Sequence, residues 1–213
     1  MTGHDGRRPA QGHATITRRI LGGRYVAAGA PPLIAVANPA LLPTWTDQPT
    51  EAMKVFTAHP GAWLFTTCFL AAGFAVSVPA VVILAGLLDS ASAKVAAATH
   101  LMGTALLTIT PVFSVTVTQD LFGKPLPDWY LPLVPWTGGV DTTVLGLLWP
   151  VAQICFGIAL LRTPLLPRWT GWTLIAVGIL MLTQLAVLGG VIPAPMFFAN
   201  IAIGVAATIS ARR

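Results

Sequence analysis

Charged residues are scarce in this chain of 213 residues: only 9% are Asp, Glu, Lys or Arg, whereas 55% are hydrophobic. Soluble domains carry about 25% charged residues, so the composition excludes that class. A run of about 20 apolar residues can span a bilayer as a helix. The sequence contains six such runs, which predict an all-α, polytopic membrane helix bundle with transmembrane helices at residues 24–42, 61–88, 95–119, 142–161, 170–191 and 195–210.

Several signatures of known chemistry are also missing. There is no P-loop, H-E-x-x-H or G-x-S-x-G motif, which excludes the common nucleotide-driven and hydrolytic mechanisms. Cys68 and Cys155 lie in separate predicted spans, which favours inert buried thiols over redox chemistry. No charged residue lies deep in a predicted span, where ion-coupled transporters usually keep one. No two potential ligands have metal-binding spacing within a span, so we expect neither a metal site nor a cofactor.

The few charges that are present are sorted by sign. With the N-terminus placed inside, the inner segments hold ten basic and two acidic residues, and the outer segments hold two basic and five acidic residues. Because basic residues stay on the cytoplasmic side of a membrane, the sequence predicts that both termini are cytoplasmic. The net charge of +5 is therefore assigned to topology and to contact with membrane lipids, not to nucleic acid.

The expected organisation is a disordered cytoplasmic tail over residues 1–19 and a single transmembrane domain over residues 20–213. Three prolines interrupt the first span, so that helix is expected to be broken and packed against protein. No G-x-x-x-G motif occurs. Helix packing is therefore expected to use scattered small residues, such as Ala71, Ala72, Gly73, Gly157, Gly178 and Gly204.

An acidic and aromatic cluster is predicted on the outer side. Carboxylic acids beside a low-dielectric wall can serve as general acids, and the candidate catalytic residues are Glu51, Asp120 and Asp141. The aromatic residues expected to line the pocket are Trp63, Trp136 and Trp149. The alternative is that tryptophans and acids gather at the outer membrane interface without a catalytic role.

Polar side chains in the outer halves of the spans form a second group. The candidate substrate-binding amides are Asn38, Gln153, Gln184 and Asn200. Trp149 and Gln153 are four residues apart and share a helix face. Amides are costly in hydrocarbon unless they are paired or face a cavity. They therefore indicate either an outward-facing polar pocket or interhelical hydrogen bonds, each worth about 0.6 kcal/mol, and both interpretations stay open.

His100 lies about two turns into the third span and is interpreted as a packing residue. Thr104 and Thr108 continue its helix face. A haem with two histidine ligands would need a second histidine at a similar depth, and the other three lie at the outer surface or in the N-terminal tail. A b-type cytochrome is therefore excluded.

The stretch over residues 161–172, LRTPLLPRWTGW, resembles a junction in many small, uncharacterised multi-pass proteins of high-GC Gram-positive bacteria. The resemblance rests on the LPRWTGW part and implies a six-helix protein of the bacterial plasma membrane, without implying an activity. The helical plan is also similar to that of small membrane terpene cyclases. Their acids lie within helices, however, and the acids of this chain do not.

Together these features predict a cofactor-free membrane enzyme. It would isomerise or cyclise a lipophilic substrate, isoprenoid or polyketide-like, by acid catalysis in an outward-facing pocket. The alternative is a passive small-molecule facilitator, a channel or a membrane accessory subunit. The expected partners are membrane lipids and the lipophilic substrate, and the oligomeric state is left open.

Overall fold

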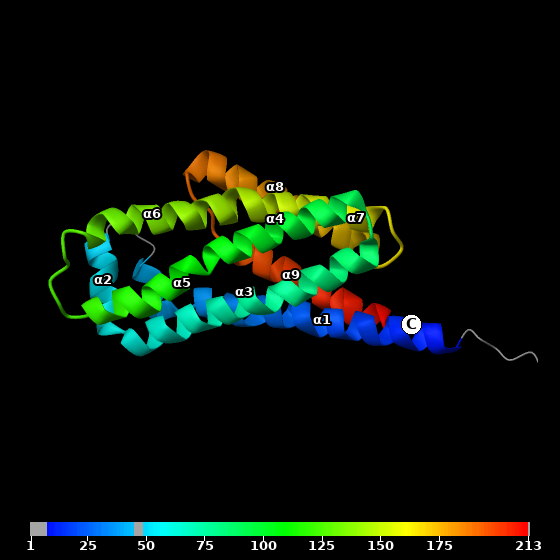
Figure 1. Ribbon diagram of the computed structural model, residues 1–213, viewed down its shortest axis with the longest axis horizontal. Coiled ribbons are helices and arrows are strands. Elements are labelled where there is room, and N and C mark those ends of the chain that lie inside the picture. Colours follow the sequence, from blue (N-terminus) through cyan, green and yellow to red (C-terminus); the bar gives the residue numbers. More distant parts are fainter. Residues whose placement is uncertain (1–7, 45–48, 213) are drawn as a thin grey trace, which may run out of the picture.

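The computed structural model describes residues 8–44 and 49–212, and every regular element in these ranges is helical. Figure 1 shows long helices that run roughly along one axis, which confirms the all-α fold class. The symbol η marks short 3₁₀ turns (η1, η3) and π-helical turns (η2, η4). In chain order the elements are α1 (Arg8–Val36), η1 (Pro39–Thr44), α2 (Pro49–Ala58), α3 (Pro60–Leu88), α4 (Ala91–Leu107), α5 (Ile109–Phe113), η2 (Ser114–Thr118), η3 (Gln119–Leu121), α6 (Tyr130–Thr143), η4 (Val144–Leu148), α7 (Trp149–Leu161), α8 (Arg168–Leu188) and α9 (Ala194–Ser210).

Four helical stretches are long and apolar enough to cross a membrane: Pro60–Leu88, Ala91–Leu121, Gly139–Leu161 and Arg168–Leu188. They coincide with the second to fifth predicted spans to within four residues. The sixth predicted span corresponds to α9, an apolar helix of 17 residues, and part of the first lies in α1. Helices α2 and α6 fall largely in segments that were expected to be loops.

Helix α1 differs from its prediction at both ends. It begins at Arg8, so residues 8–19 are helical where a disordered tail was expected. It also continues through Pro31 and Pro32 and ends at Val36 without the expected break. Gly73 of α3 makes room for the Pro32 ring, because a Cβ at Gly73 would collide with that ring. As expected, α1 packs against protein, namely α3 and α9.

The long helices form a closed ring in which each packs against two neighbours. In order round the ring, α1 contacts α3, α3 contacts α4, α4 contacts α7, α7 contacts α8, α8 contacts α9, and α9 contacts α1. The first and last helices of the chain therefore close the ring. Its interior is filled by large side chains that are almost completely buried, among them Leu84, Trp149, Met181 and Phe197.

Glycines bring neighbouring helices of the ring into backbone contact. A Cβ at Gly157 of α7 would lie 2.6 Å from the carbonyl oxygen of Gly171 in α8, and a Cβ at Gly171 would lie 2.9 Å from that of Gly157. Between α1 and α9, a Cβ at Gly204 would lie 2.7 Å from the carbonyl oxygen of Gly22. The small residues Gly73, Gly157, Gly178 and Gly204 are therefore packing positions, as predicted.

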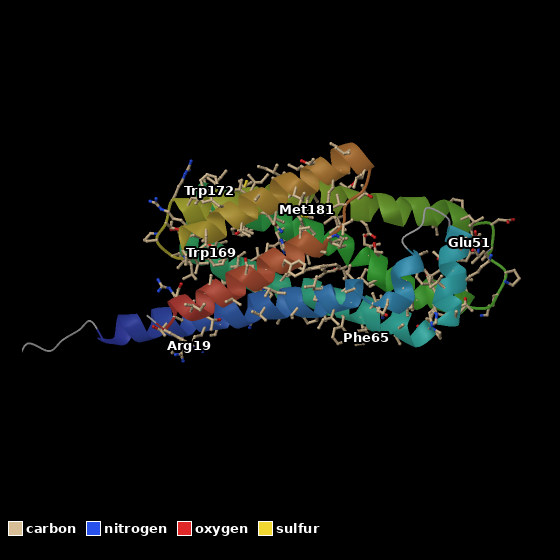
Figure 2. The ribbon with its side chains drawn as sticks, turned by 180° about the vertical axis from the view of Figure 1, so that it is seen from behind. Arg19, Glu51, Phe65, Trp169, Trp172 and Met181 are labelled. Atoms are coloured by element: carbon tan, nitrogen blue, oxygen red, sulfur yellow. The ribbon has the colours of Figure 1, made fainter. Side chains whose placement is uncertain are left out.

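The two ends of the bundle carry different charges. The basic end, which holds the α3–α4 turn, the α7–α8 loop and the end of α9, carries Asp89 and the basic residues Arg18, Arg19, Lys94, Arg162, Arg168 and Arg212 (Figures 1 and 2). The acidic end, which holds α2 and the loop after η3, carries Lys54, Lys124 and the acids Glu51, Asp120, Asp128 and Asp141.

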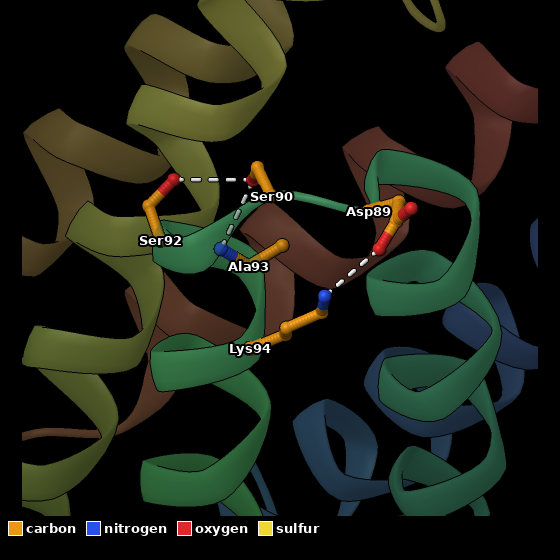
Figure 3. Close-up of polar contacts among 5 residues, drawn as sticks. All are labelled: Asp89, Ser90, Ser92, Ala93 and Lys94. Atoms are coloured by element: carbon orange, nitrogen blue, oxygen red, sulfur yellow. Dashed lines mark hydrogen bonds and ion pairs between the residues drawn. The ribbon is translucent and has the colours of Figure 1, made fainter.

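The α3–α4 turn at the basic end is held by its own polar residues (Figure 3). Asp89 ends α3 in the left-handed conformation, with φ of 35°. Ser90 caps α4, since its hydroxyl oxygen accepts a hydrogen bond of 3.2 Å from the amide of Ala93. Lys94 then reaches back to the carboxylate of Asp89 at 2.9 Å. These contacts fix a two-residue reversal between two adjacent helices of the ring.

Candidate functional site

The interior of the ring consists of two apolar clusters with polar residues between them. The cluster toward the basic end includes Leu21, Leu84, Phe156, Leu160 and Ile203. The cluster toward the acidic end contains Leu107, Val144, Trp149, Met181, Met196 and Phe197. Four helices place buried polar residues between the clusters, among them Ser77 on α3, His100 on α4, Gln153 on α7 and Asn200 on α9. These four residues are called the polar layer below.

The residues of the polar layer lie at similar depths. At a rise of about 1.5 Å per residue, the helix from Ser77 to Asp89 is about 18 Å long, and those from Ser90 to His100 and from Gln153 to Arg162 are about 14 to 15 Å long. The hydrocarbon core of a bilayer is about 30 Å thick. The polar layer therefore lies about 14 to 18 Å from the basic end, a distance close to half the thickness of such a core.

His100 is held on both its edge and its face. Its Nε2 lies 3.0 Å from the hydroxyl oxygen of Ser77. Its ring stacks on the indole of Trp149, with 5.1 Å between the ring centroids and 8° between the planes. The indole Nε1 of Trp149 donates to the carbonyl oxygen of His100 at 3.4 Å. The ring of Phe74 also packs edge to face with the indole, with 5.3 Å between the two ring centroids. These contacts join α3, α4 and α7.

The hydrogen bonds of Ser77 decide which nitrogen of His100 carries a proton. The Ser77 hydroxyl donates to the carbonyl oxygen of Phe74 at 2.7 Å. Because a hydroxyl has a single hydrogen, Nε2 of His100 must donate to Ser77. In the neutral ring, Nδ1 is then an acceptor, and it receives no hydrogen bond from the described part of the chain. Nδ1 of His100 is therefore an acceptor without a hydrogen-bond partner among the described residues.

Gln153 and Asn200 add amides to this layer. Their side chains are only 7% and 8% exposed. Among the side chains that the structure describes, Oε1 of Gln153 is buried without a hydrogen-bond partner, and the Asn200 side chain makes no hydrogen bond. An unpaired buried polar group costs about 1 to 3 kcal/mol. The layer therefore presents polar groups that its own side chains do not satisfy.

The backbone that leads into Trp149 is irregular. Residues Val144–Leu148 form a π-helical turn directly before α7. Pro150 has no amide hydrogen, so it cannot donate to the carbonyl of Gly146 as a regular helix residue would. Turns of this type recur at functional sites. Here the turn lies next to the residue that stacks on His100.

The predicted catalytic acids lie apart from the polar layer and differ from one another. Glu51 forms an exposed ion pair with Lys54 at 2.8 Å on α2, and Asp120 is exposed on η3. Asp141 is half-buried, and its Oδ1 accepts a hydrogen bond of 2.7 Å from the hydroxyl of Thr110 in α5. Only Asp141 therefore faces another helix.

The predicted substrate-binding residues fall into three groups. Trp149, Gln153 and Asn200 belong to the core described above. Asn38 and Gln184 instead bond to nearby backbone, Oδ1 of Asn38 to the amide of Ala40 and Oε1 of Gln184 to the amide of Ile192, both at 3.1 Å. Trp63 is buried at the acidic end against Phe56 and Phe122. The side chain of Trp136 lies outside the described residues.

One hollow lies at each end of the bundle. The hollow at the acidic end, of about 490 Å³, is lined by parts of α2 and of the loop after η3, including Lys54 and Lys124. The hollow at the basic end, of about 500 Å³, lies at the α7–α8 loop. Neither is lined by a residue of the predicted catalytic or substrate-binding set. The side chains that the structure describes contain no group of three potential metal ligands.

Half of the polar layer was predicted from the sequence. Gln153 and Asn200 were candidate substrate-binding residues, whereas His100 was interpreted as a packing residue and Ser77 was not a candidate. One signal could have found Ser77, because it is the only hydroxyl in the second half of the second predicted span. No family model matches the chain, and neither a curated protein nor a solved structure matches it.

Proposed function

We propose that this protein is a passive facilitator of the bacterial plasma membrane, with six spans and both termini in the cytoplasm. It binds a small uncharged solute at the polar layer. The observation that carries the proposal is the placement of Ser77, His100, Gln153 and Asn200 between two apolar clusters near the middle of the bundle. Substrate sites of membrane transporters lie near the bilayer midplane.

The chemistry of the layer indicates the class of solute. Oε1 of Gln153 and Nδ1 of His100 are acceptors, so they favour a molecule that donates hydrogen bonds. Every buried polar side chain that the structure describes is uncharged or a histidine. A buried charge would be needed to balance an ion. A neutral polyol or amide, of the size of glycerol or urea, therefore fits best.

The apolar clusters act as barriers on both sides of the layer. Passage of a polar solute requires one cluster at a time to open, because hydrophobic constrictions exclude water when they are closed. The π-helical turn Val144–Leu148 begins at Val144 and directly precedes Trp149, and both residues belong to the cluster toward the acidic end. This irregular backbone is where we expect that cluster to open.

Solute flux into liposomes tests this proposal. Purified protein is reconstituted, and the uptake of glycerol and of urea is followed by stopped-flow light scattering. We expect wild type to exceed empty liposomes, and Gln153→Leu to lower the flux about tenfold because one hydrogen bond to the solute is lost. Gln119→Leu, at an exposed amide of η3, is the matched control and should leave the flux unchanged. Flux that is equal in wild type and Gln153→Leu, or no wild-type flux above empty liposomes, contradicts the proposal.

A membrane enzyme that isomerises or cyclises a lipophilic substrate is the second candidate. The specific observation that favours it is the hydrogen bond from Thr110 to Asp141, a half-buried acid within the apolar stretch Gly139–Leu161.

Incubation with a linear isoprenoid alcohol, such as geranylgeraniol, and mass spectrometry of the products test this candidate. An acid catalyst at Asp141 predicts a loss of about a hundredfold or more in Asp141→Asn. The exposed Asp128 provides the control Asp128→Asn. Equal turnover in wild type and Asp141→Asn, or none in either, rejects the enzyme.

A further inference from the structure

The hollow at the basic end is formed by three separate segments of the chain. Its lining comes from Arg18 on α1, from Ser210 at the end of α9, and from the α7–α8 loop with both of its flanks. The loop contributes Leu161, Arg162, Thr163, Pro164, Leu165, Leu166, Pro167 and Arg168. The volume of about 500 Å³ is sufficient for the polar head of a phospholipid.

Three arginines line this hollow, and the lining contains no acid. The ion pairs among the described side chains are Lys54–Glu51 and Lys94–Asp89, so none of the three arginines has a carboxylate partner there. The guanidinium groups of Arg18, Arg162 and Arg168 therefore form a concentration of positive charge. The planar guanidinium of arginine can donate two parallel hydrogen bonds to one phosphate group. An arginine that only keeps a loop in contact with water would not need this geometry.

Exposed tryptophans set the height of the hollow relative to the bilayer. Trp169 and Trp172 in the first two turns of α8 are 49% and 62% exposed, and Figure 2 shows both at the end of the bundle that carries the hollow. Exposed tryptophans are enriched where lipid headgroups meet the hydrocarbon core. Because Arg168 directly precedes Trp169, the hollow opens at the level of the lipid phosphates.

We propose that the hollow at the basic end binds the phosphate group of an anionic phospholipid, with Arg18, Arg162 and Arg168 as its ligands. The hydroxyls of Thr163 and Ser210 line the same hollow and supply further hydrogen-bonding groups. The acyl chains of the lipid lie along the outer face of α8, beside Trp172. Basic pockets between helices on the cytoplasmic side are suited to such headgroups. The site requires a membrane-embedded protein but does not depend on the proposed solute.

Native mass spectrometry of the detergent-purified protein measures this binding directly. The probes are phosphatidylglycerol, which is anionic, and phosphatidylcholine, which is zwitterionic. We expect wild type to bind phosphatidylglycerol about tenfold more tightly, and Arg162→Gln/Arg168→Gln to lose this preference. The matched control is Lys54→Gln/Lys124→Gln, which removes two charges from the hollow at the opposite end and should keep the preference. An equal loss in the control contradicts the site.

Two further arms make the result decisive. Arg162→Lys/Arg168→Lys keeps both charges but loses the planar pairs of donors, so it should retain part of the preference that Arg162→Gln/Arg168→Gln loses, which separates lost binding from lost folding. In a thermal-shift assay, phosphatidylglycerol should raise the melting temperature of wild type, whereas inorganic phosphate alone should not. Stabilisation by inorganic phosphate to the same extent would show that the ligand is a free anion and overturn the lipid proposal.

Discussion

At the scale of single residues, Ser77 controls the imidazole of His100. The Ser77 hydroxyl donates its single hydrogen to the carbonyl oxygen of Phe74, so it can only accept a hydrogen bond from the imidazole ring. Stacking on Trp149 fixes the plane of the ring. The ring therefore has a defined orientation and a defined donor edge, and its second nitrogen has no hydrogen-bond partner among the described residues.

Ser77→Ala tests this arrangement. The substitution leaves Nε2–H of His100 unpaired in the interior, which should lower the free energy of unfolding by about 1 to 2 kcal/mol. The near-ultraviolet circular dichroism of Trp149 should also change, because the stacked ring is no longer held. Unfolding in sodium dodecyl sulfate measures the stability.

Thr183→Ala is the control for Ser77→Ala. The Thr183 hydroxyl is exposed and bonds only to the carbonyl of Ile179 in its own helix, at 2.9 Å. Its removal should leave both the stability and the spectrum almost unchanged. If Ser77→Ala behaves in the same way, the hydrogen bond to His100 does not hold the ring.

The sequence is informative about which amides are buried but not about what they bind. Gln153 and Asn200 stand on apolar helix faces, so their burial follows from periodicity. Asn38 and Gln184 have the same chemistry, yet each bonds to backbone close to a helix end. Whether an amide is buried in the core or bonds to backbone depends on where its helix ends and how the next segment turns. Neither feature is specified by an amide within an apolar run.

At the scale of helices, glycines determine how closely neighbouring helices approach. Gly157 and Gly171 face each other across α7 and α8, and each lies against the other's carbonyl oxygen. Membrane helices lack a strong hydrophobic force between them, so close backbone contact supplies much of their association. The absence of G-x-x-x-G therefore does not mean an absence of glycine packing, since one glycine on each helix is enough.

Gly157→Ala should destabilise the bundle by about 1 to 3 kcal/mol, because the new methyl group overlaps the carbonyl of Gly171 and forces α7 and α8 apart. Gly86→Ala in α3 is the matched control, since a Cβ there meets nothing within 4 Å. It should be neutral or stabilise by up to about 1 kcal/mol. Unfolding of both variants in sodium dodecyl sulfate makes the comparison. Equal stabilities would mean that α7 and α8 can separate at no cost.

Helix positions follow from the sequence more closely than helix lengths. The apolar runs locate α3 and α8 to within about three residues, because burial in lipid demands an unbroken run. The same criterion misses α2 and α6, which lie largely outside the predicted apolar runs. It also overstates the effect of Pro31 and Pro32, because Gly73 on a neighbouring helix accommodates the ring of Pro32. Such compensation is a property of the packed pair of helices.

At the scale of the whole molecule, the ring and the charge separation define two chemically distinct ends. The α3–α4 turn and the α7–α8 loop share the basic end with the end of α9. This is the arrangement that a chain with both termini on one side of a membrane would adopt, and from the positive-inside rule we propose that this side is the cytoplasm.

Cysteine labelling tests this orientation. In a Cys68→Ala/Cys155→Ala background, Ala91→Cys places a thiol at the α3–α4 turn, and Ala58→Cys places one at the end of α2; both positions are exposed. In intact cells, an impermeant maleimide should label Ala58→Cys and spare Ala91→Cys, and lysis should expose both. The reverse pattern would invert the protein, and labelling of both in intact cells would exclude a membrane barrier between them.

The unequal lengths of the helices have a consequence for the surrounding lipid. Helix α9 has 17 residues and is about 25 Å long, whereas α3 has 29 residues and is about 43 Å long. Figure 1 shows that the link between α8 and α9 stops short of the end that carries α2. In the six-span arrangement proposed above, a bilayer of uniform thickness could not match both helices, so it would have to thin beside α9 or allow α3 to tilt and protrude. The mismatch between helix length and bilayer thickness therefore depends on the length of the lipid acyl chains, and short-chain lipids should reduce it beside α9.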